Sequence, residues 1–112
     1  MKKYDYTIYQ VGVNEDFCFM RWEVARRHNW SFDPYKIVWE GTEESSDDYD
    51  LLNYLYEVFN ERRPSDFRGH SMSVSDIIMI CDDDGSTYYY CDSFGWEDIT
   101  DNVMKEMRCQ LC

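Results

Sequence analysis

One short stretch of the chain combines the residue types that hydrolases use. A serine, a histidine and an aspartate perform nucleophilic catalysis when each side chain holds the next within hydrogen-bonding reach. Five residues here carry those groups: His70, Ser71, Ser73, Ser75 and Asp76. Triad members come from separate elements, however, and no G-x-S-x-G turn is present. Small polar residues in a loop that enters a strand more often bind main-chain groups. We therefore expect this segment to brace the fold, and we predict no catalytic residue.

The cysteines and one aspartate run could bind metals, but each set is incomplete. Cys109 and Cys112 form a C-x-x-C pair without a second pair, whereas structural zinc takes four ligands. The run from Asp82 to Gly85 resembles the start of a calcium loop but lacks the glutamate that completes one. Cys81 and Cys91 flank a predicted hairpin and could face each other across it. We interpret them as reduced thiols and predict no metal or cofactor.

Acidic residues are numerous and segregated along the chain. There are 23 Asp and Glu against 11 Lys and Arg, which gives a net charge of −12. Residues 37–61 and 69–104 each contain eight acids and no Lys or Arg. Segregated charge creates a field that extends about 8 Å into solution at physiological salt. This charge excludes direct binding to nucleic acid and docking on an anionic membrane.

Two interpretations of the acidity stay open. It could serve only solubility, or it could form a face that competes with nucleic acid for a basic partner. The ten tyrosines and four tryptophans exceed what one small core can hide, so some should be exposed as interface anchors. We expect reversal of Glu43, Glu44, Asp47, Asp48 and Asp50 to Lys or Arg to leave the fold intact, although Asp47, Asp48 and Asp50 are also candidates to cap the second helix. The candidate partner-binding residues are Glu43, Glu44, Asp47, Asp48, Tyr49, Asp50, Asp82, Asp83 and Asp84.

Length and patterning predict a single compact α+β domain over residues 1–112. The longest apolar run, residues 77–81, is far shorter than the roughly 20 residues of a membrane span. We expect a small mixed or antiparallel sheet, a hairpin in the C-terminal half and three helices, in the order β-α-β-α-β-β-α. Strands are predicted at residues 4–11, 35–40, 77–81 and 86–92, and helices at 15–28, 49–60 and 97–112. An acidic loop at 41–48 should cap the second helix through Ser46, Asp47 or Asp48.

Three segments carry a family resemblance. The chain opens with Y-T-I-Y-Q at Tyr6–Gln10, continues with P-S-D-F-R-G-H-S-M-S-V-S-D at Pro64–Asp76, and has Y-Y-C-D-S-F-G-W at Tyr89–Trp96. Over residues 4–96 this pattern resembles the YodL-like domain, with Cys91 in place of an apolar residue and Trp96 in place of phenylalanine. Residues 97–112 are then an added C-terminal helix. The resemblance implies a setting in phages and conjugative elements, beside antirestriction proteins, and no enzymatic activity.

These observations predict a cytoplasmic, phage- or mobile-element-encoded anti-defence protein in a bacterial host. It would be a non-enzymatic acidic inhibitor that binds a CRISPR-Cas or restriction effector and blocks its nucleic-acid site. The alternative is a generic interaction module of mobile-element proteins whose acidity serves only solubility. A small hydrolase that uses His70 is the weakest of the three hypotheses.

Overall fold

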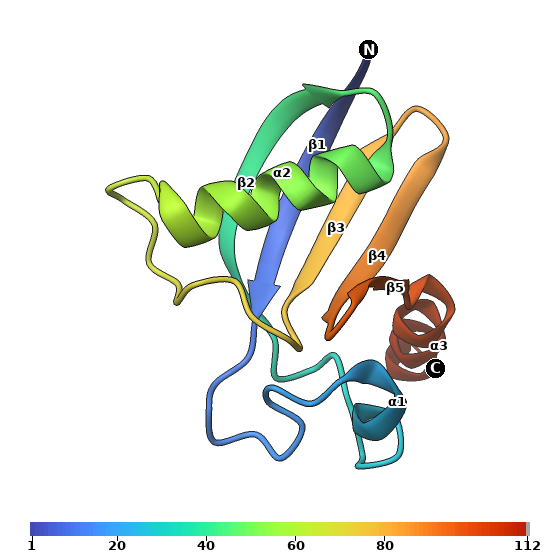
Figure 1. Cartoon of the computed structure of the whole chain (residues 1–112). Helices are drawn as coiled ribbons and strands as arrows, with labels where there is room; N and C mark the ends of the chain where they lie inside the picture. Colours follow the sequence, from blue (N-terminus) through green and yellow to red (C-terminus); the bar gives the residue numbers. More distant parts are fainter. Residues whose placement is uncertain (112) are drawn as a thin grey trace.

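The fold is built on one five-stranded sheet. The computed structural model describes residues 1–111, with the side chains of residues 1–108. The strands are antiparallel throughout and lie in the order β2-β1-β3-β4-β5, which confirms the α+β class (Figure 1). The elements are β1 (Lys2–Gln10), α1 (Trp22–Ala25), β2 (Lys36–Ser45), α2 (Asp48–Glu61), β3 (Ile77–Asp82), β4 (Gly85–Asp92), β5 (Gly95–Asp98) and α3 (Thr100–Leu111).

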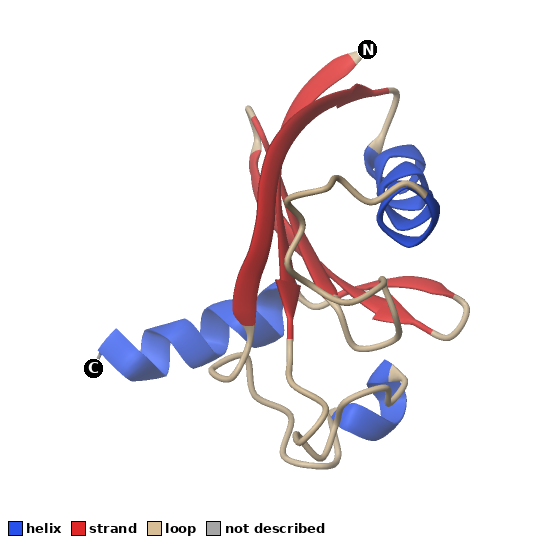
Figure 2. Cartoon of the chain, turned by 90° about the vertical axis from the view of Figure 1, so that its left-hand side faces the viewer, coloured by secondary structure: helices blue, strands red, loops and turns tan. Residues whose placement is uncertain are grey.

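Helix α2 covers one face of the sheet. Alternate residues of a strand point to opposite faces, and Tyr4, Tyr6 and Ile8 of β1 all point toward α2. The helix packs its predicted apolar stripe against them, and the stripe residues Leu51, Leu52, Leu55 and Phe59 are fully buried. Figure 2 shows α2 on one side of the sheet and α3 on the other. None of the helices in the described part of the chain is both long and apolar enough to cross a membrane.

A second apolar cluster fills the opposite face. Ile99, which directly precedes α3, and Val103, which lies within it, are completely buried there, as their spacing predicts. They pack with aromatic residues from β4 and from the long β1–β2 connection, and the Trp22 and Tyr90 rings lie 5.0 Å apart. The helices α1 and α3, which contribute to this cluster, lie away from the β3–β4 turn (Figure 1).

The predicted helix at 15–28 is wrong. Only Trp22–Ala25 is α-helical, and Phe19 has a φ of 67°, a left-handed conformation that a helix does not continue through. Turns with i→i−3 bonds precede it, such as Cys18 N to Glu15 O at 3.0 Å. The main-chain N–H of Trp22 donates to Asp92 Oδ1 in β4 at 3.1 Å, so a tertiary contact fixes where the helix begins.

The predicted acidic loop at 41–48 is also corrected, because its first five residues extend β2. They pair with the N-terminal half of β1, with Tyr6 opposite Gly41 and Lys2 opposite Ser45. Glycine is required at 41, since a Cβ atom there would lie 2.6 Å from the Tyr6 hydroxyl oxygen. Glu43 and Glu44 are therefore held on a strand.

An unpredicted strand, β5, replaces the start of the predicted final helix. It pairs with β4 and places Trp96 opposite Cys91. Helix α3 begins only at Thr100, whose N–H donates to Asp98 Oδ1 at 2.9 Å. The order is thus β-α-β-α-β-β-β-α. The second helix and the hairpin at residues 77–92 are confirmed, with boundaries shifted by one residue.

Candidate binding surface at the acidic end of the sheet

The two predicted acidic segments lie at the same end of the sheet. Lys2 of β1 pairs with Ser45 at the end of β2, and its Nζ forms an ion pair with Asp82 Oδ2 at 3.5 Å. The β2–α2 connection and the β3–β4 turn both lie at the end where the chain begins (Figure 1). We call this region, formed by residues 43–50 and 82–84, the acidic end. The fold thus brings together acids that are far apart in the sequence.

The buried phenol of Tyr4 lies between these segments. Its burial, together with the carboxylates of Asp48, Asp82 and Asp47, raises the pKa of Tyr4 to about 12. Carboxylates from both segments therefore act on one group, which means that they contribute to a common negative field.

Three of the predicted binding residues are structural. Asp47 caps α2, as predicted, by accepting from Asp50 N at 2.9 Å. Asp48 Oδ2 accepts from the Tyr89 hydroxyl at 2.7 Å, and Asp82 Oδ1 accepts from Asp84 N at 2.9 Å. The expectation that Asp47 and Asp48 tolerate charge reversal stays a prediction, and their bonds to the helix start and to β4 argue against it, as the bond of Asp82 to the hairpin turn argues against reversal there. The acids that remain for a partner are Glu43, Glu44, Asp50, Asp83 and Asp84.

Tyr49 stands among these acids with 53% of its surface exposed. Its ring packs edge-on against that of Tyr89, with centroids 5.7 Å apart. The side chain is thus held in place while much of it faces solvent, as an interface anchor must be. The predicted exposure of tyrosines is confirmed for Tyr49, Tyr54 and Tyr56, whereas Tyr4, Tyr6, Tyr88 and Tyr90 are buried.

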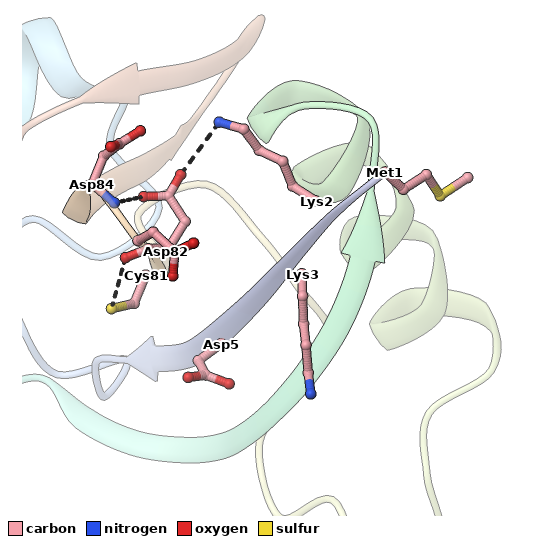
Figure 3. A pocket seen from close by; sticks show the side chains of 8 residues that line it. Met1, Lys2, Lys3, Asp5, Cys81, Asp82 and Asp84 are labelled. Carbon is pink, nitrogen blue, oxygen red and sulfur yellow. Dashed lines mark hydrogen bonds and ion pairs between the residues drawn. The ribbon is translucent and has the colours of Figure 1, made fainter.

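A solvent-open cleft of about 760 Å³ gives the acidic end a concave surface (Figure 3). It forms because the pairing of β1 with β3 stops at Asp5 and Cys81, so the first residues of β1 diverge from the β3–β4 turn. Asp82, Asp83 and Asp84 line one side, and Met1, Lys2 and Lys3 line the other. The cleft therefore carries both signs of charge.

The segment at residues 70–76 has the geometry of a brace. The Asp76 carboxylate is fully buried, and its Oδ2 accepts from Ser73 N at 2.9 Å and from Gln10 Nε2 at 3.1 Å. His70 Nε2 lies 3.9 Å from Asp76 Oδ1, and His70 Nδ1 lies 2.8 Å from the carbonyl oxygen of Ser71. Both imidazole nitrogens are thus directed at these two groups, and neither is directed at a serine hydroxyl as a general base would be.

The titration properties of the buried groups also disfavour nucleophilic chemistry. Burial raises the pKa of Cys91 to about 12 and also raises that of Cys18, whereas a reactive thiol needs a lowered pKa. Cys81 lies opposite Ser86 on β4 and Cys91 lies opposite Trp96 on β5, so these two cysteines do not face each other across the hairpin. The side chains of Cys109 and Cys112 lie outside the described residues. Within the described residues, no three His, Cys, Asp or Glu side chains cluster as a metal site would require.

Gln10 is the member of the brace that sequence reasoning missed. Its Nε2 donates to the carbonyl oxygen of His70 at 2.8 Å, and its Oε1 accepts from His70 N at 3.0 Å. This pair of bonds fastens the 64–76 segment to the end of β1. The sequence does show a glutamine at the end of the Y-T-I-Y-Q run. Nothing in that pattern, however, indicates which residue the glutamine would contact.

Gly69 allows this close approach, which yields a testable prediction. A Cβ atom on Gly69 would lie 2.3 Å from Gln10 Oε1. We expect Gly69→Ala to lower the free energy of unfolding by about 2–4 kcal/mol, because the amide must move and abandon its bonds to His70. Urea denaturation measures this. Gly12→Ala is the matched control, since nothing lies within 4 Å of its Cβ position. Equal losses in the two variants would contradict the role of the brace.

A comparison with protein-family models matches residues 5–102 to the YodL-like domain. The chain belongs to the YodL-like domain family. The matched part of this YodL-like domain contains most of β1, the strands β2 to β5, helix α2 and the start of α3, so it includes the brace and both acidic segments. Neither a search of curated proteins nor a search of solved structures returned a significant match.

Proposed function

We propose that this YodL-like domain is a non-enzymatic binding protein whose acidic end occupies a cationic nucleic-acid site on a partner protein. The observation that carries the proposal is the convergence of two acidic segments at one end of the sheet, each within a stretch free of Lys and Arg. Duplex DNA carries one negative charge per roughly 1.7 Å of its axis, so proteins that hold it present lysine and arginine. An acidic surface of fixed shape competes for the same groups.

Rigid positioning supports this proposal. Glu44 lies on β2, Asp50 in the first turn of α2 and Asp83 in the β3–β4 turn, and all three are exposed. The strands are locked by pairing and the helix by its buried stripe, so the carboxylates are arranged before binding. Preorganised charges lose little conformational freedom when they meet a partner.

For the partner class, we propose a defence nuclease of the bacterial host, either a CRISPR-Cas effector or a restriction enzyme. The setting of phages and conjugative elements that the family resemblance implies motivates this choice. Such enzymes hold nucleic acid in basic channels, which is the chemistry that the acidic end complements. The domain would act in the bacterial cytoplasm as an inhibitor, and the orientation of His70 and the raised pKa of Cys18 are consistent with a non-enzymatic role.

A second candidate is an interaction module of larger mobile-element proteins, with acidity that serves solubility and folding. It is favoured by the number of acids that the fold itself uses. Besides Asp47, Asp48 and Asp82, Asp92 binds the start of α1, and Glu106 accepts from Phe32 N at 2.7 Å. A high acid content is therefore not by itself a sign of competition with nucleic acid.

Affinity capture from a bacterial host, followed by mass spectrometry and elution in a salt gradient, separates the two candidates. If the acidic end binds a nucleic-acid site, the enriched protein should be a nucleic-acid-binding enzyme, and it should elute as salt rises because screening weakens charge pairs. A partner without nucleic-acid-binding activity, or one retained unchanged at 1 M salt, where the Debye length is about 3 Å, would favour the interaction module instead.

A further inference from the structure

Strand β2 lies at one edge of the sheet and has only β1 as a neighbouring strand. Figure 2 looks onto this edge, with α2 to one side of the strand. Pairing with β1 is regular from Trp39 to Ser45 and is interrupted by a bulge at Val38. Within the described part of the chain, the main-chain hydrogen bonds of residues 36–45 go only to β1. Every second residue of the regular segment 39–45 therefore directs its N–H and C=O groups away from the sheet.

This edge has little of the protection that exposed edges usually carry. Proteins commonly blunt an edge strand with lysine, proline, a bulge or a covering segment. Residues 39–45 contain neither lysine nor proline, and the bulge lies before them. Gly41, in the middle of the segment, has no side chain that would hold another strand away. The edge can thus accept one more strand, as in peptide recognition by strand addition.

Acidic side chains mark one face of this segment. Residues that lie opposite each other in an antiparallel pair share a face of the sheet. Because Tyr6 faces α2 and lies opposite Gly41, the alternate residues Glu40, Thr42 and Glu44 project from the other face. All three are exposed, and the two glutamates belong to none of the ion pairs among the described residues.

Strand β1 adds to the negative charge of the same face. Asp5 lies opposite Thr42 and accepts from its hydroxyl at 2.9 Å, so a third carboxylate lies near the two glutamates. Lys3 lies opposite Glu44 without forming an ion pair with it. The face therefore presents three carboxylates and one ammonium group along an edge whose main chain is free to pair.

We propose that the edge of β2 binds an extended segment of a partner protein that carries lysine or arginine at the positions facing Glu40 and Glu44. These positions lie on one face of the added strand, with one residue of that face between them. Cross-strand pairs of opposite charge stabilise a sheet, so the glutamates supply selectivity while the main-chain bonds supply affinity. This inference does not rest on the proposed function, although Glu44 belongs to both surfaces.

The same acids disfavour a second copy of this chain as the occupant. If two copies paired antiparallel with Thr42 opposite Thr42, each Glu40 would lie opposite a Glu44. Like charges in that position destabilise a sheet. Two copies would also bring together net charges of −12 each. In the register that uses all of residues 39–45, the glutamates thus oppose self-pairing, whereas a basic strand is attracted by them.

The test is an NMR titration of the isotope-labelled domain with the blocked peptide Thr-Lys-Val-Lys-Val-Lys-Thr. We expect saturable shifts of the main-chain amides of residues 39–45, slower hydrogen exchange at every second one of them, and intermolecular NOEs typical of paired strands. The peptide Thr-Lys-Pro-Lys-Pro-Lys-Thr carries the same charge but lacks the strand's donors, so it should produce no saturable shift. The peptide Thr-Glu-Val-Glu-Val-Glu-Thr should bind at least tenfold more weakly than the lysine peptide.

Two double variants with the same charge change locate the site. Glu40→Lys with Glu44→Lys should weaken binding of the lysine peptide at least tenfold, because repulsion replaces attraction across the added pair of strands. Glu15→Lys with Asp16→Lys alters exposed residues of the β1–β2 connection and should leave binding nearly unchanged. Circular dichroism checks that both variants are folded.

Four outcomes would overturn the inference. These are the absence of saturable shifts in residues 39–45, equal binding of the proline peptide, equal effects of the two double variants, and a dimer in sedimentation velocity whose β2 amides are already protected without peptide. Because the titration uses no captured partner, its failure leaves the proposed function standing.

Discussion

The triple variant Glu44→Lys, Asp50→Lys and Asp83→Lys is expected to bind the captured partner at least 100-fold more weakly than the native domain while remaining folded. Each reversal replaces an attraction to a basic site with a like-charge repulsion, which costs several kcal/mol across an interface. Since about 1.4 kcal/mol corresponds to a tenfold change, a 100-fold loss needs only about 3 kcal/mol in total. Isothermal titration calorimetry measures the affinity.

The fold should survive because these three side chains are exposed. Asp50 accepts from the Ser46 hydroxyl and lies near the positive end of α2, so its reversal costs about 0.3–1 kcal/mol. Asp47, Asp48 and Asp82 are left intact because the fold depends on them. Thermal denaturation followed by circular dichroism checks that the variant is folded before its affinity is measured.

The control carries the same charge change on another part of the molecule. Glu15, Asp16 and Asp33 are exposed and belong to the β1–β2 connection, at the opposite end of the sheet (Figure 1). Each reversal adds two positive charges, so both triple variants move the net charge from −12 to −6. The control triple should lose little affinity. Equal losses in the two triples would mean that net charge, and not the acidic end, drives binding.

Asp76→Asn is expected to flatten the pH dependence of stability. Burial raises the pKa of Asp76 to about 7 in the folded domain, against an ordinary value of about 3.9, although Ser73 N, His70 and Gln10 oppose the shift. The folded state therefore binds this proton more tightly than the unfolded chain does. The resulting stabilisation is fully present below about pH 4 and is lost as pH rises through about 7. Its full size is on the order of 4 kcal/mol.

Asparagine keeps an oxygen that can accept from Ser73 N but cannot ionise. Urea denaturation of both proteins at pH 4.5 and pH 7.5 isolates the effect of Asp76, because the other acids are common to both. The native domain should lose stability relative to the variant as the pH rises. A difference between the two proteins that stays constant with pH would show that Asp76 does not titrate in this range.

The parts of the fold with a strong local pattern were predictable. Helix α2 combines a capping aspartate with an apolar stripe, and β3 and β4 are dense in β-branched and aromatic residues around a short turn. The segment at 15–28 has helical spacing too, yet a left-handed residue at Phe19 and a bond from Trp22 to Asp92 override it. Contacts between residues so distant in sequence leave no local periodicity to read.

The acidic segments of the candidate site were predictable from the charge pattern, but the role of each residue within them was not. Segregated charge located the two acidic segments that the fold brings to one end of the sheet, whereas the sequence could not separate Asp48, which binds Tyr89 from 41 residues away, from the exposed Glu44. The contact between the Tyr56 and Trp96 rings was not predictable for the same reason, since it joins a helix to a strand that was itself not predicted. Contacts that form only in the folded chain decide whether a carboxylate or an aromatic ring stabilises the fold or is exposed to a partner.

Competition with nucleic acid tests the central claim most directly. The affinity of the domain for the captured partner would be measured at increasing concentrations of the duplex or guide that the partner binds. If the acidic end occupies the nucleic-acid site, the apparent Kd should rise in proportion to the nucleic-acid concentration, and no ternary complex should form. A stable ternary complex with an unchanged Kd would contradict the proposal that the domain competes with nucleic acid.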